Sequence, residues 1–333
     1  MITIYILQKL LSILILFKLK SFYGFISLFL FFIIFFFKED SHDILNYIRQ
    51  VGYTDTYELF FHNIIKIINL ATDDKALVIT IYQLLLLIFA SCISFFFKEN
   101  KILILSIILS SIAIMLGVHN NLRQGTSSIF ILLGIISYIH GNKKIGITLI
   151  LSSMGFHRSS IFFISLIAVL GMIFNIVVTR NYFKKYPHIV NISFITFVGA
   201  LFAVIVINYL IYFISFQSYL GRDIASHSQT RLPHELKVLI LFLFWLSTEI
   251  FVKFRTIDIQ IDFFRYLRQF LIFFIVILAF FDLFNEISNR IIYFYYIIEM
   301  ALLCFYVDRK MYNITVYMLI IYGFALNVWS IVA

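Results

Sequence analysis

The sequence predicts an all-α polytopic membrane protein. Of its 333 residues, 62% are hydrophobic and only 13% are charged, and the mean hydropathy is +1.00. A water-soluble core with a charged shell is therefore excluded for most of the chain. Long apolar runs alternate with short polar clusters, and the chain contains only two prolines, which is typical of membrane-spanning helices joined by tight loops.

About twelve spans can be read along the chain, and we expect them to form a single integral membrane domain over residues 1–333. The first span lacks a basic leader and a cleavage site and is interrupted by Lys9, so we expect it to be retained rather than cleaved as a signal peptide. The expected spans are residues 2–17, 21–37, 76–97, 102–118, 123–139, 145–156, 158–178, 189–214, 238–252, 269–284, 291–306 and 313–331.

Basic residues between the spans predict the orientation of the chain. If the N-terminus lies outside, fifteen of the 26 basic residues lie on the inner side and ten on the outer side, as the positive-inside rule requires. The net charge of +9 is spread singly between spans, so it indicates topology rather than nucleic-acid binding. The inner residues are Lys18, Lys20, Lys98, Lys101, Lys143, Lys144, Arg180, Lys184, Lys185, Lys253, Arg255, Arg265, Arg268, Arg309 and Lys310.

The outer side differs from the inner side in its kind of basic residue. It has six arginines to four lysines, whereas the inner side has five arginines to ten lysines. A guanidinium binds phosphate with two parallel hydrogen bonds and stays charged when partly dehydrated, so the outer side is predicted to bind phosphate. For any single arginine, a contact with lipid headgroups explains the residue equally well. The outer arginines are Arg49, Arg123, Arg158, Arg222, Arg231 and Arg290.

Two outer segments, residues 38–75 and 215–237, are long enough to do more than turn the chain. The second is polar, and we expect a loop there. The first contains a run with helical periodicity, which predicts an amphipathic helix lying flat on the bilayer. Its expected apolar face is Phe60, Ile64, Ile67, Ile68 and Ala71, and its expected polar face is Glu58, His62 and Lys66.

Arg123 begins an expected span just after two asparagines, either of which can cap the helix. The helix N-terminus carries unsatisfied amides and the positive end of the macrodipole, both of which favour an anion. Gly125, Ser127 and Ser128 follow, and their small side chains would let a phosphate approach closely. The same residues also fit a headgroup-binding arginine beside a small-residue packing face.

His157 and Arg158 lie between two apolar stretches so short that the chain must turn near them. We therefore expect His157 at or below the outer surface, within a cavity. An ionisable group at that depth is a candidate functional residue. A hydrogen-bonded structural histidine is the alternative interpretation.

Acidic residues supply further candidates. Asp43 and Tyr47 are one helical turn apart, as are Glu58 and His62, so each pair can present a polar cluster on one helix face. The acids of residues 39–43 are bunched rather than set at ligand spacing, so no metal site is expected.

A later span repeats the arrangement seen at Arg123. Arg290 begins an apolar run at another expected outer helix end. Glu299 lies about midway along the same helix, on the side opposite Arg290. We expect Glu299 to contact the interior of the helix bundle.

Motifs of soluble-substrate enzymes are missing from the sequence. It contains no Ser-His-Asp order, phosphate-binding glycine loop, zinc-binding helix pattern or nucleotide fingerprint. It also lacks the Asp-x-Asp motif of enzymes that use nucleotide sugars. A lipid-linked donor is therefore favoured over a soluble one.

With these residues identified, the chain resembles the EpsG-like group of Wzy-type polysaccharide polymerases. The matching elements occur in order between about residues 40 and 295. They are an acid and a tyrosine after the second span (Asp43, Tyr47), Tyr-Glu at the start of the amphipathic helix (Tyr57, Glu58), Arg-Gln opening a span (Arg123, Gln124), Phe-His followed by serines (Phe156 to Ser160), and Arg with Tyr-Phe near the end (Arg290 to Phe294).

The resemblance implies a GT-C-like membrane glycosyltransferase in the bacterial cytoplasmic (inner) membrane, with its active site facing the periplasm or exterior. It would join oligosaccharide repeat units carried on undecaprenyl diphosphate, both donor and acceptor being lipid-linked. A chain-length regulator protein is a further partner that it suggests. The products would be O-antigen, capsule or exopolysaccharide.

The same resemblance assigns roles to the candidate residues. Arg123 and Arg290, then Arg158, would neutralise the leaving diphosphate, so no metal or other cofactor is required. Gln124 and Tyr47 would lie in the same binding site, and Gly125, Ser127 and Ser128 would line a groove for the polyprenyl chain. His157, Glu58 or Asp43 would accept the proton of the attacking hydroxyl, with His157 favoured.

Two alternatives share the same substrates. A flippase for lipid-linked sugars needs cationic grooves and about twelve spans, but it should show related halves and charges at mid-membrane depth. An O-antigen ligase uses the same donor, but residues 215–237 are short for the large outer loop of ligases.

Overall fold

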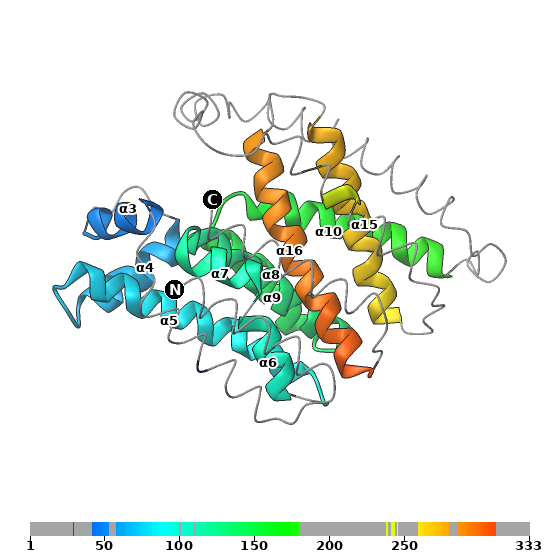
Figure 1. The fold of residues 1–333 in the computed structure, drawn as a ribbon, viewed down its shortest axis with the longest axis horizontal. Helices are drawn as coiled ribbons and strands as arrows, with labels where there is room; N and C mark the ends of the chain where they lie inside the picture. Colours follow the sequence, from blue (N-terminus) through cyan, green and yellow to red (C-terminus); the bar gives the residue numbers. More distant parts are fainter. Residues whose placement is uncertain are drawn as a thin grey trace. The chain divides into compact units, whose positions relative to one another are not determined.

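The structure is a computed structural model that describes residues 42–52, 58–99, 101–109, 111–179, 259–279 and 285–310, with single positions at 29, 238, 241–243 and 245. Every regular element in these residues is a helix. The chain divides into two compact units. Unit 1 contains Met1–Ile164 and Glu299–Val332, and unit 2 contains Ser165–Ile298. Each unit is described by itself (Figure 1).

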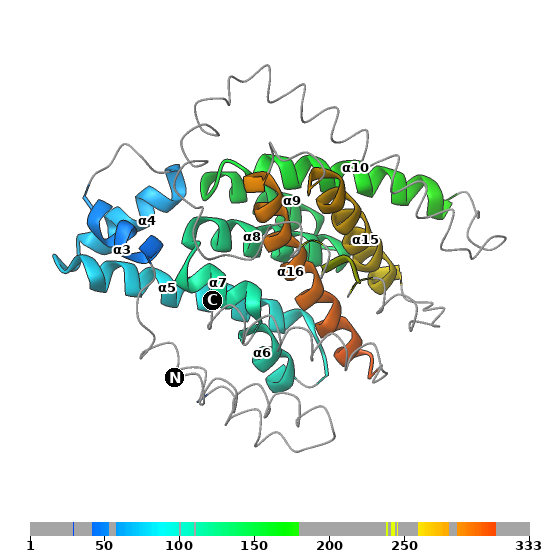
Figure 2. The ribbon, with the colours of Figure 1, turned by 45° about the horizontal axis from the view of Figure 1, so that its top comes forward.

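Unit 1 begins with two short helices that pack on a long one. Helices α3 (His42–Gln50) and α4 (Leu59–Asn69) both contact α5 (Lys75–Cys92), as Figures 1 and 2 show in blue and cyan. The carboxylate of Asp74 caps α5 by accepting hydrogen bonds from the amides of Ala76 and Leu77 at 2.9 and 3.2 Å. The 3-10 helix η1 (Ile93–Phe96) continues α5.

Helix α4 confirms that a helix lies in the first outer segment, and the side that packs on the protein is not the expected apolar face. The buried face carries Phe61, Ile65 and Ile68, together with Glu58 just before the helix, which follows the i, i+3, i+7 spacing of one helix side. Phe60 is 39% exposed and Ile67 is 66% exposed. Contact of the exposed apolar residues Phe60 and Ile67 with the bilayer stays a prediction.

The expected span 102–118 is not one straight helix. Helix α6 (Lys101–Leu109) ends before residue 110, and α7 (Ile112–His119) begins again at an angle of 51° to it. Ser111 explains the restart, because its hydroxyl accepts a hydrogen bond from the amide of Ile114 at 3.3 Å and caps α7.

A helical hairpin forms the centre of unit 1. Helix α8 (Leu122–Ile139) turns at residues 140–142 into α9 (Lys143–Ser152), and the two pack closely along their length. A Cβ atom built on Gly134 would lie 2.7 Å from the carbonyl oxygen of Gly146, and one built on Gly146 would lie 2.7 Å from that of Gly134. The two backbones can approach this closely because both residues lack a side chain.

After the hairpin the chain makes the turn expected near His157. The 3-10 helix η2 (Ser153–Gly155) follows α9 directly, and the next helix is α10 (Ser160–Thr179). Residues 156–159 form the tight turn between η2 and α10. His157 therefore lies in a short connection between two helical segments, as the sequence predicted.

The last turns of α16 (Asn285–Asp308) return to the first half of the chain within unit 1. The carboxylate of Asp308 accepts hydrogen bonds from the amides of Lys98 and Glu99, each at 2.9 Å. The rings of Phe97 and Phe305 pack edge to face, with centroids 5.0 Å apart. These contacts join segments about 210 residues apart in sequence.

Unit 2 contains α15 (Ile259–Ala279) and shows a buried arginine that was expected in an inner loop. Arg268 lies within α15 and is 1% exposed, and Arg265 one turn earlier pairs with Asp262 at 3.8 Å. Helix α15 thus begins ten residues before the expected span 269–284. The loop expectation was wrong because isolated charges inside an apolar helix resemble the polar end of a span.

Three helices among the described residues are long and apolar enough to cross a membrane, namely Lys75–Phe96, Leu122–Ile139 and Arg290–Asp308, and the bent pair α6–α7 makes a fourth if it is one span. They correspond to the expected spans 76–97, 123–139, 291–306 and 102–118. The expected spans 2–17, 189–214 and 313–331, nearly all of 21–37 and 238–252, and the outer loop 215–237 lie outside the described residues. The chain is thus an integral membrane protein whose described elements are all helices, and the number twelve stays a prediction.

Candidate functional site

Glu58 occupies the N-cap position of α4, but its side chain does not cap the helix. The backbone carbonyl accepts the first helical hydrogen bond, from the amide of His62 at 2.9 Å. The carboxylate instead points to residues of α8 and of the turn before α10, and Glu58 is buried. A buried carboxylate is costly unless it is paired, so the partners of Glu58 define the centre of the site.

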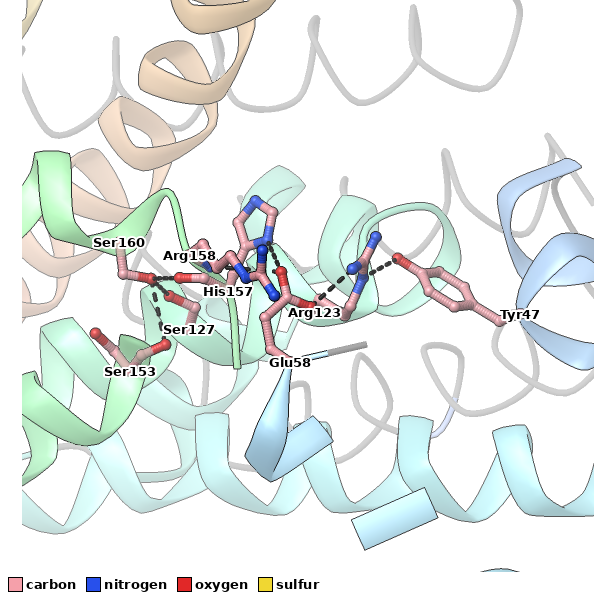
Figure 3. Close-up of polar contacts among 8 residues, drawn as sticks. All are labelled: Tyr47, Glu58, Arg123, Ser127, Ser153, His157, Arg158 and Ser160. Carbon is pink, nitrogen blue, oxygen red and sulfur yellow. Dashed lines mark hydrogen bonds and ion pairs between the residues drawn. The ribbon is translucent and has the colours of Figure 1, made fainter. Parts of the chain in front are cut away.

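Glu58 contacts residues of two segments that are far from it in the sequence, Arg123 in one and His157 with Arg158 in the other (Figure 3). Its Oε2 atom lies 2.7 Å from Nη1 of Arg123. Its Oε1 atom lies 3.2 Å from Nδ1 of His157 and accepts a hydrogen bond from the backbone N–H of Arg158 at 3.4 Å. The two carboxylate oxygens therefore have different partners, one of them the guanidinium and the other the imidazole.

Arg123 is the second residue of α8, as expected from the sequence. Asn121 stands at the N-cap position, but its side chain makes no capping hydrogen bond, so the expected asparagine cap is wrong. The guanidinium is held instead by side chains from other segments. Its Nε donates to the hydroxyl of Tyr47 at 3.3 Å, and its Cζ lies 5.7 Å from the centroid of the Tyr47 ring.

His157 lies in the turn between η2 and α10 and is buried. Its amide donates to the carbonyl of Ser153 at 3.2 Å, and its carbonyl accepts from the amide of Ser160 at 3.0 Å. Both backbone groups of His157 are therefore satisfied within the turn, which leaves the imidazole to point at Glu58.

Electrostatics fix the protonation state of Glu58. Burial by itself raises the pKa of this carboxyl, but the hydrogen bond with His157 and the charge of Arg123 outweigh it and lower the pKa to about 2. An ionised carboxylate only accepts hydrogen bonds, so the Nδ1 atom of His157 carries the proton that faces Glu58. In the neutral form of the ring, Nε2 is the nitrogen that can accept a proton.

The cations of the cluster are more exposed than its carboxylate. The side chain of Arg123 is 22% exposed and that of Glu58 is 7% exposed, and Arg158 is exposed. Two arginines and one ionised carboxylate leave a net positive charge on the accessible side. Burial raises the pKa of Tyr47 despite the opposing charge of Arg123, so the tyrosine stays a neutral hydrogen-bonding group beside these charges.

The small residues after Arg123 do not line an open groove. Gly125 packs so closely on α7 that an added Cβ would lie 2.7 Å from Cα of Gly117. Ser127 and Ser128 are buried, 2% and 1% exposed. The expected groove for a polyprenyl chain is therefore wrong at these positions, and the alternative of a small-residue packing face is right.

The remaining candidates lie in different places. Asp43 is exposed on α3, and no contact joins it to Glu58 among the described residues. Glu58 and His62 do not form a shared polar cluster, because Glu58 is turned toward α8. Gln124 is buried next to Arg123 on α8.

Arg290 does not repeat the arrangement of Arg123. It belongs to unit 2 and lies in the second turn of α16, because that helix begins at Asn285. The polar residues before it extend the helix, so the start of the apolar run was mistaken for the start of the helix. Glu299 is buried on the same helix, as the sequence predicted.

Sequence reasoning found the members of the cluster but not the way they pair. Glu58 precedes Arg123 by 65 residues and His157 by 99, and no local periodicity connects residues at such separations. The hydrogen bonds of Ser127 and Ser160 were missed as well. Two buried serines near a candidate histidine were the available signal, because buried hydroxyls need partners.

The fold and this cluster define a helical membrane protein that holds an exposed cationic group beside a histidine–carboxylate pair. The model of the EpsG family matches residues 20–333, and the chain belongs to this family, which is that of Wzy-like polysaccharide polymerases. No curated protein and no solved structure matches the chain.

Proposed function

We propose that this protein is a GT-C-like glycosyltransferase that polymerises oligosaccharide repeat units linked to undecaprenyl diphosphate, at the outer leaflet of the bacterial cytoplasmic membrane. The growing chain is transferred from its lipid diphosphate to the non-reducing end of the next lipid-linked unit. The observation that carries the proposal is the single carboxylate of Glu58, which holds both a guanidinium and an imidazole. A glycosyl transfer to a hydroxyl needs a cation for the leaving group and a base for the nucleophile.

Arg123 is the proposed cation for the leaving diphosphate. As the bond between the anomeric carbon and the diphosphate oxygen breaks, negative charge grows on that oxygen, and fixed donors lower the barrier. Tyr47 and Glu58 hold the guanidinium from two directions, so its orientation is fixed before the substrate arrives. Arg158 adds a second, exposed cation next to His157, and the role of Arg290, which lies in unit 2, stays a prediction from the sequence.

His157 is the proposed general base. The acceptor hydroxyl forms the new bond to the anomeric carbon and transfers its proton to Nε2 of His157, while Nδ1–H donates to Glu58 and keeps the ring in that tautomer. The positive charge on the doubly protonated imidazole is then balanced by Glu58. Gln124 lies beside Arg123 and is proposed to contact the same substrate.

The other two candidate bases are less suited to the task. A carboxylate whose pKa is about 2 is a weak base near neutral pH, because efficient bases have a pKa near the working pH. Glu58 is therefore proposed to orient His157 rather than to take the proton. Asp43 is exposed on α3, and its charge acts on Tyr47, so it is proposed to have no direct part in the proton transfer.

The experiment is reconstitution of the purified protein in liposomes with lipid-linked repeat units extracted from cells that lack the gene. We expect polymer to form with the parent protein and to shorten strongly with Arg123→Lys, which keeps the charge but loses the two-pronged geometry. Arg49→Lys changes an exposed outer arginine on α3 and should leave polymer length unchanged.

Other outcomes would replace the proposal. Movement of intact lipid-linked units between leaflets without lengthening would mean a flippase. Transfer of finished polymer to a different acceptor lipid would mean a ligase. Polymer of unchanged length with Arg123→Lys would show that Arg123 does not bind the leaving group.

A further inference from the structure

The turn that carries His157 is closed by a buried hydroxyl. Ser160, the first residue of α10, is fully buried, and its Oγ lies within hydrogen-bonding distance of two carbonyl oxygens, that of Ser153 at 3.2 Å and that of His157. The first carbonyl belongs to the first residue of η2 and the second to the histidine itself. The hydroxyl therefore lies at the backbone of His157, whereas Glu58 lies at its ring.

A second hydroxyl can donate a hydrogen bond to the Oγ of Ser160. Ser160 has only one hydroxyl proton and can donate it to one carbonyl at a time. The Oγ of Ser127 is also hydrogen-bonded to the Oγ of Ser160 (Figure 3). When Ser127 donates to Ser160, the proton of Ser160 is directed to a carbonyl of the turn, so the two hydroxyls act as one chain.

Helix α8 carries both residues that hold His157 in place through a neighbour. Arg123 and Ser127 are one helical turn apart and lie on the same side of α8. Arg123 reaches the imidazole through Glu58, and Ser127 reaches the backbone of the same residue through Ser160. The separation between the cation and the histidine is thus set from a single rigid element.

We propose that Ser127 and Ser160 are positioning residues that set the placement of His157 relative to Arg123. The proposal rests on the proposed function, in which His157 takes the proton and Arg123 meets the leaving group. Loss of either hydroxyl should allow the turn to shift while the substrate still binds. A misplacement of about 1 Å is enough to slow an oriented reaction by one to two orders of magnitude.

A neighbouring serine provides a matched control. Ser159 is buried next to Ser160, but its Oγ has no hydrogen-bond partner among the described residues. Ser159→Ala therefore removes a buried hydroxyl of the same size from the same turn without breaking a hydrogen bond. It should leave turnover unchanged.

The test measures kcat, KM and Tm of the full-length protein in liposomes or detergent, with extracted lipid-linked repeat units as substrate. The variants are Ser160→Ala, Ser127→Ala, the double variant, Ser159→Ala and His157→Gln. We expect kcat to fall about 10-fold in each single variant with KM within about twofold. The double variant should be no slower than the worse single one, because the hydroxyls form one chain.

Each outcome has a separate meaning. The positioning role would be overturned if Ser160→Ala and Ser127→Ala both keep full kcat. It would also be overturned if the losses of kcat multiply in the double variant, or if Ser159→Ala loses as much kcat as they do. If Ser160→Ala does not fold, Ser127→Ala decides the question alone. If His157→Gln keeps full activity, His157 is not the base and that part of the proposed function fails. If His157→Gln is inactive while the two serine variants keep full kcat, only the positioning role of Ser127 and Ser160 is refuted.

Discussion

Glu58 holds its two partners with different oxygens, which makes it sensitive to a change as small as an amide. A carboxylate can accept hydrogen bonds at both oxygens, whereas a glutamine can accept at only one. Glu58→Gln would therefore keep the shape of the side chain but lose either the contact with Arg123 or the one with His157. Losing one partner of a buried pair leaves the other charge uncompensated.

The low pKa of Glu58 gives the stability of the protein a defined pH dependence. Because the pKa is about 2 in the folded protein and 4.5 ordinarily, the carboxylate stabilises the fold fully above pH 4.5, and this contribution is lost as the pH falls toward 2. We expect the Tm of the parent protein to exceed that of Glu58→Gln near pH 6 and the difference to shrink between pH 4.5 and 2. Thermal unfolding in detergent at several pH values measures both.

Asp43→Asn is the control for this titration, because Asp43 is an exposed acid on the adjacent helix α3. Its Tm should follow that of the parent protein at every pH. A difference between the parent and Glu58→Gln that stays constant down to pH 2.5 would contradict the ionised buried pair.

At the scale of single residues, the sequence was informative about chemical type and silent about pairing. Arg123, His157 and Glu58 could be selected because charged groups are rare in so apolar a chain. Their pairing depends on how α4 and the turn before α10 pack against α8, and no local rule of sequence reports that packing. The choice of base among His157, Glu58 and Asp43 stays a prediction, and the structure adds that His157 and Glu58 are hydrogen-bonded to each other.

At the scale of helices, periodicity located elements better than it oriented them. Helices α4 and α8 lie where the sequence placed them. The side of α4 that packs on the protein was not predicted, because lipid and protein both favour apolar residues and polarity does not separate the two environments. The break between α6 and α7 was missed because two serines in an apolar run do not by themselves signal a helix end.

The α8–α9 hairpin depends on two glycines. In Gly146→Val, the new side chain would meet the backbone carbonyl of Gly134 and the Cβ of Tyr138 at 2.7 and 2.8 Å, which forces the helices apart. Overpacking of this kind costs about 1–3 kcal/mol. We expect a lower Tm in detergent, while Ile147→Val, on the exposed side of α9, should leave the Tm unchanged. An unaltered Tm in Gly146→Val would mean that the hairpin is looser than described.

At the scale of the whole molecule, the two hydrogen bonds accepted by the Asp308 carboxylate join the end of α16 to the segment after η1. Asp308→Ala removes the acceptor for two backbone amides and should destabilise unit 1 by at least about 1.5 kcal/mol, since hydrogen bonds to charged groups contribute about that much or more. Thermal or denaturant unfolding measures the loss.

Lys310→Ala distinguishes the contribution of the Asp308 hydrogen bonds from that of the neighbouring ion pair. Lys310 pairs with Glu99 at 3.1 Å, but both side chains are largely exposed, and such surface pairs contribute little. If Lys310→Ala and Asp308→Ala lowered the free energy of unfolding equally, the charges near the end of α16, rather than the two backbone hydrogen bonds, would provide the stability.

The orientation in the membrane can be tested at two exposed turns. We expect a cysteine at Asp73, between α4 and α5, to react with a membrane-impermeant thiol reagent in intact cells. A cysteine at Asn142, in the α8–α9 turn, should react only after the membrane is opened. The unsubstituted chain, with Cys92 and Cys304 in place, gives the background. The reverse labelling pattern would place the Glu58 cluster on the cytoplasmic side.

The class of the whole molecule followed from composition alone, because no water-soluble fold can bury so large an apolar fraction. The family followed from a few polar residues in order. The contact between α16 and the segment after η1 could not be foreseen, since it depends on how distant helices pack rather than on any local pattern.

The separation of Glu58 from its partners also bears on the biogenesis of the protein. Glu58 leaves the ribosome 65 residues before Arg123 and 99 before His157. An unpaired carboxylate is strongly disfavoured away from water. We therefore expect Glu58 to stay hydrated until the α8–α9 hairpin and the start of α10 have been synthesised and inserted. Assembly of the Glu58 cluster is therefore a late event, in which an early helix packs onto later ones.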